Sequence, residues 1–373
     1  MNAQVVVAVT IALFTATGCV QAQPTLKDAF KNKFLIGAAL NPAQFTEQNA
    51  AQAALVKQQF NSITPENVMK WVLIHPQPEQ YDFAPADRYV EFGAKNGMFI
   101  IGHTLVWHSQ TPRWVFENGT GGPADRATLL ARMSNHIHTV VGRYKGRVKG
   151  WDVVNEALEE DGSLRASPWL KIIGEDYLVK AFEFAHAADP AVELYYNDFS
   201  LENEPKRNGA IKLVKKLQAA GVKVTGIGTQ THAKLDWPSP QLVDETLTAF
   251  GKLGVKIMIT ELDIDVLPAR SQDRSADVSR RDAAAPALNP YANGLPDAVQ
   301  QTLARRYGEL FDVYVKHAGQ ITRITFWGVT DGDSWLNNWP IRGRTSYPLL
   351  FDRQCQPKPA FDAVIKTAAR GVE

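Results

Sequence analysis

Cysteine, excess charge and long apolar runs are all scarce in this sequence, and each shortage excludes a class of protein. Only 2 of the 373 residues are cysteine, namely Cys19 and Cys355. Small disulfide-rich domains are therefore excluded, and the fold must be stabilised by core packing. The 40 Lys and Arg nearly balance the 39 Asp and Glu, giving a net charge of +1. Such a chain has no field to attract nucleic acid or an anionic membrane, so a neutral or lightly charged substrate is expected.

The most apolar run near the start, Val5 to Phe14, is too short to cross a bilayer. Small residues at Val20-Gln21-Ala22 follow it, which predicts a secretory signal peptide over residues 1–22. We therefore expect a secreted or periplasmic protein. Lipidation at Cys19, which ends a lipoprotein-like Ala-Thr-Gly-Cys box, is the alternative and the only expected route to a membrane. Residues 23–373 are predicted to form one catalytic domain that acts as a monomer.

Eight short apolar segments alternate with longer segments of helical periodicity. The expected strands are Phe34–Ala38, Ser62–Thr64, Met98–Gly102, Trp151–Val154, Glu193–Tyr196, Val224–Ile227, Lys256–Thr260 and Ile324–Trp327. The expected helices are Ala51–Phe60, Pro85–Lys95, Ala127–Tyr144, Pro168–Ala188, Lys206–Ala220, a segment between Ser239 and Gly254, Asp297–His317 and Pro359–Ala369. Strict alternation with strands too apolar to face water predicts an α/β fold, a single (β/α)8 TIM barrel. A doubly wound open sheet is the alternative, disfavoured because no Gly-rich phosphate motif follows the first strand.

Polar side chains follow seven of these strands at the same end. They are Glu66, Asn67 and Lys70; His103 and Gln110; Asn155 and Glu156; Asn197 and Asp198; Gln230 and His232; Glu261 and Asp263; and Asp331. Any one of them can be explained as a helix cap or a turn residue. The carboxyl ends of barrel strands converge on one mouth, where active sites are built, so the repetition indicates a site.

The expected mouth is also rich in tryptophan. Six of the nine Trp follow strands, namely Trp71, Trp107, Trp114, Trp327, Trp335 and Trp339. Core packing is the alternative explanation and is preferred for Trp169, which lies in an expected helix. Flat aromatic faces beside amides and carboxylates suit a sugar ring, which needs apolar contact for its CH face and hydrogen bonds for its hydroxyls.

Two of the strands are built alike, each with a Gly before an apolar run and a Glu at its end. The glutamates are Glu156 and Glu261. Cleaving an acetal needs one acid to protonate the leaving oxygen and one carboxylate to trap the sugar carbon. Asp263 points the same way as Glu261 along an extended chain, and His232 on the adjacent strand is placed to bridge them and keep Glu261 ionised. Glu156 has no basic partner in sequence, as a proton-bearing acid requires.

We expect neither a metal nor a cofactor. His136 and His138 are spaced like a ligand pair, but they are predicted to flank the buried face of an amphipathic helix. The segment from Asp265 to Leu295 is too long for an ordinary loop and would lie at the mouth of a barrel.

Six segments carry a resemblance to a known family. They are Ile63-Thr64-Pro65-Glu66-Asn67-Val68-Met69-Lys70-Trp71, Gly102-His103-Thr104-Leu105-Val106-Trp107-His108, Trp151-Asp152-Val153-Val154-Asn155-Glu156-Ala157, Gly226-Ile227-Gly228-Thr229-Gln230-Thr231-His232, Ile259-Thr260-Glu261-Leu262-Asp263-Ile264 and Phe326-Trp327-Gly328-Val329-Thr330-Asp331. In this order they resemble the family 10 glycoside hydrolases, the endo-β-1,4-xylanases. A lone Asn-Glu after a strand is common among barrel glycosidases, whereas the full ordered set is highly specific.

The resemblance implies a role for each matching position. Glu156 would be the acid/base and Glu261 the nucleophile of a retaining reaction on xylan and xylo-oligosaccharides, with carboxyls roughly 5 to 5.5 Å apart. Asn155 would bind the 2-hydroxyl of the sugar, while His232 and Asp263 would orient Glu261. The remaining implied contacts are Glu66, Asn67, Lys70, His103, Trp107, Gln110, Gln230, Trp327 and Trp335 on the glycone side and Tyr196 and Asn197 on the aglycone side.

The long segment after Asp265 departs from the family pattern, so it leaves the aglycone subsites and the tolerance of branches open. Two alternatives to a xylanase stay open at this point. One is a cellulase or mixed-linkage β-glucanase on the same barrel. The other is a secreted carbohydrate-binding protein without catalysis, which would keep the aromatic residues but has no need of both Glu156 and Glu261.

Overall fold

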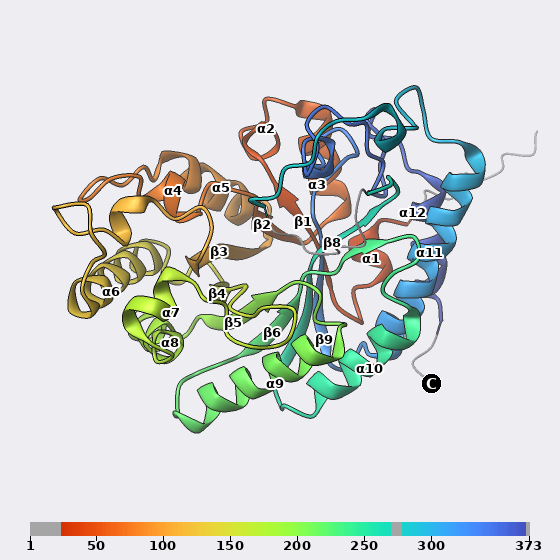
Figure 1. Cartoon of the computed structure of the whole chain (residues 1–373). Helices are drawn as coiled ribbons and strands as arrows, with labels where there is room; N and C mark the ends of the chain where they lie inside the picture. Colours follow the sequence, from red (N-terminus) through yellow and green to blue (C-terminus); the bar gives the residue numbers. More distant parts are fainter. Residues whose placement is uncertain (1–23, 270–277, 371–373) are drawn as a thin grey trace, which may run out of the picture.

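The computed structural model describes residues 24–269 and 278–370 (Figure 1). The expected signal peptide, with Cys19, lies outside these residues. Within the described ranges, no helix is both long enough and apolar enough to cross a membrane.

Eight parallel strands close into a barrel (Figure 1). They are β1 (Leu35–Leu40), β2 (Ser62–Pro65), β3 (Phe99–Trp107), β4 (Gly150–Asn155), β5 (Glu193–Asp198), β6 (Gly226–Thr229), β8 (Lys256–Asp265) and β9 (Ile321–Phe326). Pairing of β6 with β8 and of β9 with β1 completes the ring. The predicted (β/α)8 barrel and all eight predicted strands are therefore confirmed.

Helices surround this ring. They are α1 (Leu26–Ala29), α2 (Pro42–Phe45), α3 (Ala50–Gln59), α4 (Trp71–Ile74), α5 (Ala84–Lys95), α6 (Arg126–Arg143), α7 (Pro168–Ile173), α8 (Tyr177–Ala188), α9 (Glu204–Ala219), α10 (Pro240–Gly251), α11 (Asp297–Lys316) and α12 (Pro359–Ala368). The prediction of one continuous helix over 168–188 was wrong, because Gly174 has a φ of 91° and divides the segment into α7 and α8. A left-handed residue cannot continue an α-helix, and glycine adopts it most readily.

Two strands are longer than the apolar runs that predicted them. Strand β3 continues through His103 to Trp107, and β8 continues through Glu261 and Asp263 to Asp265. The polar residues His103, Glu261 and Asp263, expected in loops, thus lie within strands, although the strand pairing shifts register beside His103 and around Glu261. One strand was not expected: β7 (His232–Lys234) follows β6 after a short interruption and pairs with the end of β8.

The centre of the barrel is filled below the mouth. Tyr195, Ile101 and Met258 form a separate buried cluster there. The ring of Tyr195 lies over Gly150, where an added Cβ would approach it to 2.3 Å, so only glycine fits. Among the described residues, this packing fills the interior of the barrel below the carboxyl ends of its strands.

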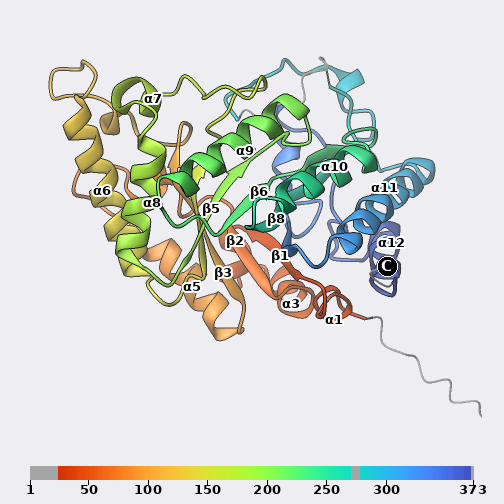
Figure 2. The same cartoon turned by 90° about the horizontal axis from the view of Figure 1, so that it is seen from below.

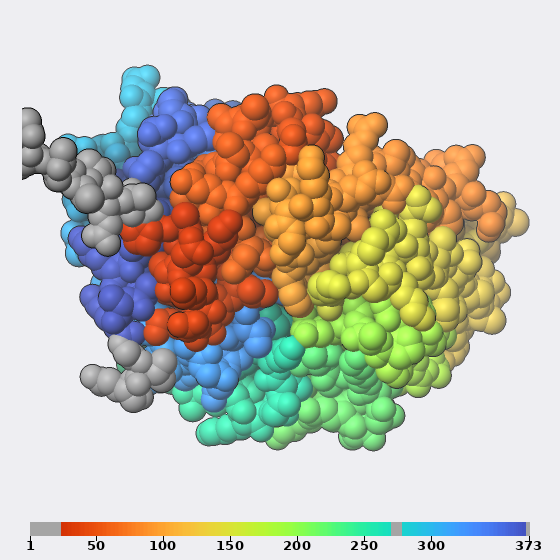
Figure 3. All heavy atoms as spheres, turned by 180° about the vertical axis from the view of Figure 1, so that it is seen from behind, coloured from red at the N-terminus to blue at the C-terminus, as the bar shows by residue number. Residues whose placement is uncertain are grey.

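The first and last described segments meet on one side of the molecule. Figure 3 shows the earliest described residues beside the C-terminal helix α12. Helix α1 packs on α12, and Lys33 Nζ donates to the Arg370 carbonyl at 3.1 Å. Neighbouring helices pack on one another as well, and in the view of Figure 2 α10 and α11 lie side by side along the outside of the barrel.

Candidate active site

A cavity of about 110 Å³ lies at the carboxyl end of the barrel strands. Thirteen predicted site residues line it, namely Glu66, Asn67, Lys70, His103, Trp107, Gln110, Asn155, Glu156, Gln230, His232, Glu261, Trp327 and Trp335. Asn197 and Asp263 lie directly behind this lining and hydrogen-bond to it. The mouth predicted from the strand ends is therefore present as a single pocket.

Glu156 stands immediately after β4 with a φ of 57°, a backbone conformation that a non-glycine residue rarely adopts. Arg165 Nε donates to its carbonyl at 2.9 Å and holds this turn. The Glu156 carboxyl is 4% exposed and accepts from Trp107 Nε1 at 2.7 Å and Gln230 Nε2 at 3.0 Å. Burial, together with the charge of Glu261, raises its pKa, so this carboxyl favours the protonated form.

Glu261 has the opposite tendency, although it is equally buried. Its Oε1 accepts from Asn197 Nδ2 at 2.9 Å, and its Oε2 lies 3.2 Å from His232 Nε2. Burial alone would raise the pKa of Glu261, but the hydrogen bond from His232 and the neighbouring positive charge lower it overall. Glu261 is therefore held as a carboxylate.

His232 helps to keep Glu261 ionised through its hydrogen bond and its charge, which add to the charge of His103. Its Nδ1 lies 3.0 Å from Asp263 Oδ1, and Trp335 Nε1 donates to the other Asp263 oxygen at 2.7 Å. Burial lowers the pKa of His232, but Asp263 and Glu261 outweigh it and raise that pKa to about 10. The imidazolium is thus shared between two carboxylates at neutral pH.

We expect His232→Gln to move the acidic limb of the kcat/KM profile to higher pH by about 1 to 3 units, the usual effect of losing an opposite charge. The pKa of Glu261 is lowered in the parent chain, so activity that requires its carboxylate is lost only at low pH. Without the imidazolium, protonation of Glu261 begins earlier as the pH falls. Initial rates on a soluble substrate across the pH range would measure this. An acidic limb that stays in place would contradict the role of His232.

Amide side chains link the two glutamates. Asn197 Nδ2 donates to Asn155 Oδ1 at 2.9 Å as well as to Glu261, while Thr260 Oγ1 donates to Asn197 Oδ1 at 2.6 Å. Gln230 Nε2 lies 3.4 Å from Asn155 Oδ1 and also bonds Glu156. This chain of bonds fixes the orientation of the amides between the acid and the carboxylate.

Aromatic and charged groups form the walls of the pocket. Lys70 Nζ lies 5.0 Å from the ring centre of Trp107 and bonds Asn67 Oδ1 at 3.1 Å. The rings of Trp335 and Trp339 stack with centres 4.5 Å apart. His103 is held by Asp152 at 2.9 Å beside the edge of Trp327. Flat faces next to hydrogen-bonding groups are what a sugar ring requires.

Tyr196 was predicted to contact substrate, and this was wrong. Its side chain is completely buried, and its hydroxyl donates to Asp198 Oδ2. Neighbouring residues on a strand point to opposite faces, so Tyr196 and Asn197 cannot both enter the mouth. Asn197 takes the inner face but is fully buried behind the lining, so it supports Asn155 and Glu261 and does not make the predicted substrate contact. Tyr196 packs outward in the main core.

Tyr196→Phe is accordingly expected to leave KM and kcat unchanged within about two-fold, since the ring touches no substrate. It should lower the free energy of unfolding by about 1 to 3 kcal/mol, because Asp198 loses a buried hydrogen bond. Denaturant unfolding and steady-state kinetics on the same preparation would measure both quantities. A large rise in KM with unchanged stability would restore Tyr196 to the binding site.

Two of the expected mouth tryptophans, Trp71 and Trp114, are also placed elsewhere. The ring of Trp71 is 2% exposed, stacks on His136 with centres 3.7 Å apart and meets the edge of Trp114. His136 was expected to flank the buried face of α6 but is itself fully buried, and its burial lowers its pKa well below the usual range. Trp169 is core, as predicted, and its Nε1 donates to the Trp107 carbonyl at 2.9 Å.

The long segment after β8 reaches the site, and its contribution was not assigned from sequence. Val278 from this segment lines the pocket. Further along, Asp282 N donates to the Pro340 carbonyl, and Thr345 N donates to Asn289 Oδ1 at 2.9 Å. The segment therefore packs on the loop that follows β9, a pairing of distant residues that no local pattern signals.

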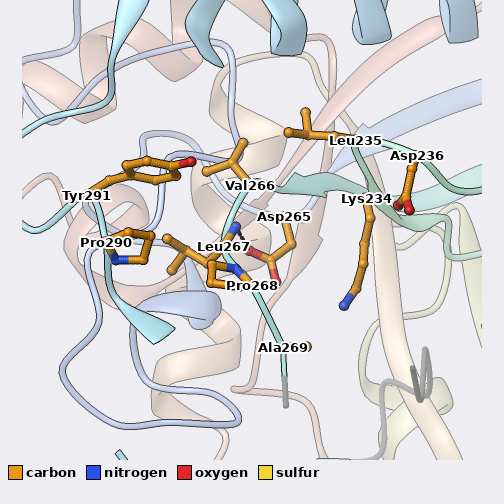
Figure 4. Close-up of a pocket in the computed structure, with 10 residues that line it drawn as sticks. All are labelled: Lys234, Leu235, Asp236, Asp265, Val266, Leu267, Pro268, Ala269, Pro290 and Tyr291. Atoms are coloured by element: carbon orange, nitrogen blue, oxygen red, sulfur yellow. Dashed lines mark hydrogen bonds between the residues drawn. The ribbon is translucent and has the colours of Figure 1, made fainter. Parts of the chain in front are cut away.

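A larger cavity of about 360 Å³ adjoins this segment (Figure 4). Lys234 of β7 and Asp265 of β8 line it and are paired in register, two residues beyond the pair formed by His232 and Asp263. Figure 4 shows Tyr291 and Pro290 on the side of the cavity opposite Lys234.

In the part of the chain that the structure describes, no group of three or more His, Cys, Asp or Glu is arranged to hold a metal.

Comparison with known proteins agrees with this geometry. The model of the glycosyl hydrolase family 10 matches residues 25–367. An endo-1,4-beta-xylanase A of Xylanibacter ruminicola is 44% identical over 346 residues, covering 93% of this chain and 94% of that protein. A beta-1,4-xylanase of Dictyoglomus thermophilum is 44% identical over 345 residues, covering 92% and 91%.

The solved structures include a similar protein. A GH10 endoxylanase from a sugarcane soil metagenome superposes with a TM-score of 0.89 at 47% sequence identity, covering 91% of this chain and 99% of that one. The family model spans a range that includes all the barrel strands and all the residues that line the pocket. The chain therefore belongs to glycosyl hydrolase family 10.

Proposed function

We propose that this chain is a retaining endo-1,4-β-xylanase, with Glu156 as the acid/base and Glu261 as the nucleophile. The observation that carries the proposal is one pocket holding two buried carboxyls whose pKa values are shifted in opposite directions. Retaining hydrolysis needs this division, because one group must donate a proton while the other attacks as an anion.

In the first step, a Glu261 oxygen forms a bond to the anomeric carbon as the bond to the leaving sugar breaks. Glu156 gives its proton to the departing oxygen, so the leaving sugar departs as a neutral alcohol. The product is a covalent glycosyl ester on Glu261. Asn155, fixed by Asn197 and Gln230, is placed to bind a hydroxyl of the reacting sugar.

In the second step, Glu156 acts as a base. Esterification removes the charge of Glu261, which raised the pKa of Glu156 in the free enzyme, so that pKa falls. Glu156 then takes a proton from water while the water oxygen attacks the anomeric carbon and displaces Glu261. Two inversions give net retention and restore both groups to their starting protonation states.

The choice of xylan over glucan is supported by the relatives and by the tryptophan walls of the pocket. The two similar proteins are named as a xylanase acting on 1,4-beta linkages and a beta-1,4-xylanase. Xylose lacks the hydroxymethyl group of glucose, and walls formed by Trp107, Trp327 and Trp335 close to the sugar would obstruct that group.

The test compares xylohexaose with cellohexaose at matched concentrations. We expect kcat/KM to be at least about 10-fold higher for the xylose chain, the discrimination typical of one extra group in a pocket. Early release of internal fragments, with the β-anomer formed first by NMR, would support an endo-acting retaining enzyme. Faster cleavage of cellohexaose would favour a glucanase, and binding without turnover would favour a carbohydrate-binding protein.

A further inference from the structure

The chain is interrupted between β6 and β7 in a way that serves both halves of the site. Gln230, which bonds Glu156, and His232, which bonds Glu261, stand on either side of Thr231. Thr231 has a φ of 55°, a left-handed conformation that is costly for a β-branched residue. This kink allows two residues so close in sequence to contact two different glutamates, so something must hold it.

A buried carboxyl group outside the pocket contacts the kink. Glu202, in the turn between β5 and α9, is 1% exposed. Its Oε1 accepts from Thr229 Oγ1 at 3.0 Å and from Thr231 Oγ1 at 2.9 Å. The two hydroxyls therefore converge on one oxygen, and Gln230 lies between them in the chain.

The backbone around the kink is tied to the catalytic strands as well. Gln230 N donates to the Asp198 carbonyl at 3.0 Å, and Glu261 N donates to the Gln230 carbonyl at 3.0 Å. Glu202 itself is fixed in place, since Arg207 Nη1 donates to its carbonyl at 3.3 Å. A displacement of the kink would therefore move both the side chain of Glu261, through His232, and its backbone, through the Gln230 carbonyl.

We propose that Glu202 is a positioning residue of this active site, which clamps Thr229 and Thr231 so that Gln230 and His232 reach Glu156 and Glu261. Glu202 does not line the pocket and touches no substrate. Its contribution rests on the proposed function, because it acts only through the partners of the proposed acid/base and nucleophile.

The first test is Glu202→Ala, which removes the shared acceptor. We expect kcat on xylohexaose to fall by about 10- to 100-fold, the cost of misplacing catalytic groups by a fraction of an ångström. Glu202→Gln should recover kcat to within about three-fold of the parent chain, because its amide oxygen accepts the same two hydroxyl protons. A purely structural role would lower stability without this loss and recovery of kcat.

The matched control is Thr367→Val, which removes another buried threonine hydroxyl on α12, away from the pocket. It should lower the melting temperature but leave kcat unchanged. If Glu202→Ala does not fold, Thr229→Val combined with Thr231→Val removes the two donors and should show the same loss of kcat. Equal kcat in that double variant and the parent chain would overturn the clamp.

Coupling gives a second, independent measurement. The double variant Glu202→Ala, Gln230→Ala should lose less kcat than the product of the fold losses of the two single variants, because both changes remove the same support from Glu156. Multiplicative effects would overturn the proposal. The parent chain is assayed alongside on xylohexaose and cellohexaose. If the substrate assignment is wrong, the parent chain itself will cleave xylohexaose slowly. If only the role of Glu202 is wrong, the parent chain will be active and the ratio of variant kcat to parent kcat will differ from the prediction.

Discussion

Glu261→Gln is expected to lower kcat on xylan by about 10⁴-fold or more, comparable to the loss of other catalytic nucleophiles. The amide keeps the shape of the side chain and can still contact Asn197, so the fold should be preserved. It cannot form the glycosyl ester, because a neutral amide is a poor nucleophile. Reducing-end release from xylan measures the effect, and a residual activity above about a tenth of the parent rate would contradict the assignment.

The stereochemistry of rescue identifies which face of the sugar Glu261 occupies. Glu261→Gly opens space for azide. Azide would attack the anomeric carbon of an activated aryl β-xyloside from the face that Glu261 normally occupies, opposite the leaving phenol, and give the α-xylosyl azide. Glu183→Gln is the matched control, since Glu183 pairs with Lys180 on the exposed surface of α8. That variant should keep full activity and produce no azide adduct.

Glu156→Ala is expected to lower kcat on xylan by about 10²- to 10⁴-fold, the usual contribution of a positioned general acid. Aryl xylosides with acidic phenol leaving groups need no proton, so the first step should remain fast on them. The second step should slow, because no base is left to activate water. A pre-steady-state burst of phenol followed by a slow phase would show this directly.

The same variant distinguishes the two glutamates with azide. In Glu156→Ala the glycosyl ester on Glu261 still forms, and azide entering the vacated space would attack it from the opposite face, giving the β-xylosyl azide. An α-azide here, or equal losses on xylan and on activated aryl xylosides, would mean that the roles of the two glutamates are not those proposed.

Much of the architecture follows from periodicity and strand-end chemistry. The alternation of apolar runs and helical segments was sufficient to predict the barrel. The rule that strands meet at their carboxyl ends brought Glu66, His103 and Trp335 together although they are far apart in sequence. The bridge from His232 to Asp263 and Glu261 was predicted from strand geometry alone and has the expected partners.

The errors arose where the face of a strand or a distant contact decides the outcome. Tyr196 was assigned to the pocket together with Asn197 on the family resemblance, whereas strand alternation turns the two side chains apart. Trp71 follows a strand as Trp107 does, but the aromatic stack with His136 on α6 draws it into the core. Val278 and Glu202 reach their positions through packing between segments distant in sequence, and single-sequence patterns do not encode such packing.

The meeting of α1 and α12 has a practical consequence for presenting this protein on a surface. Lys33 and Arg370 join at the side where the barrel strands begin, opposite the carboxyl ends that carry the cavity. A linker attached at either end of the described chain would orient the molecule with the cavity facing away from the support. Immobilisation through either end of the described chain thus keeps the catalytic opening facing an insoluble polysaccharide rather than the support.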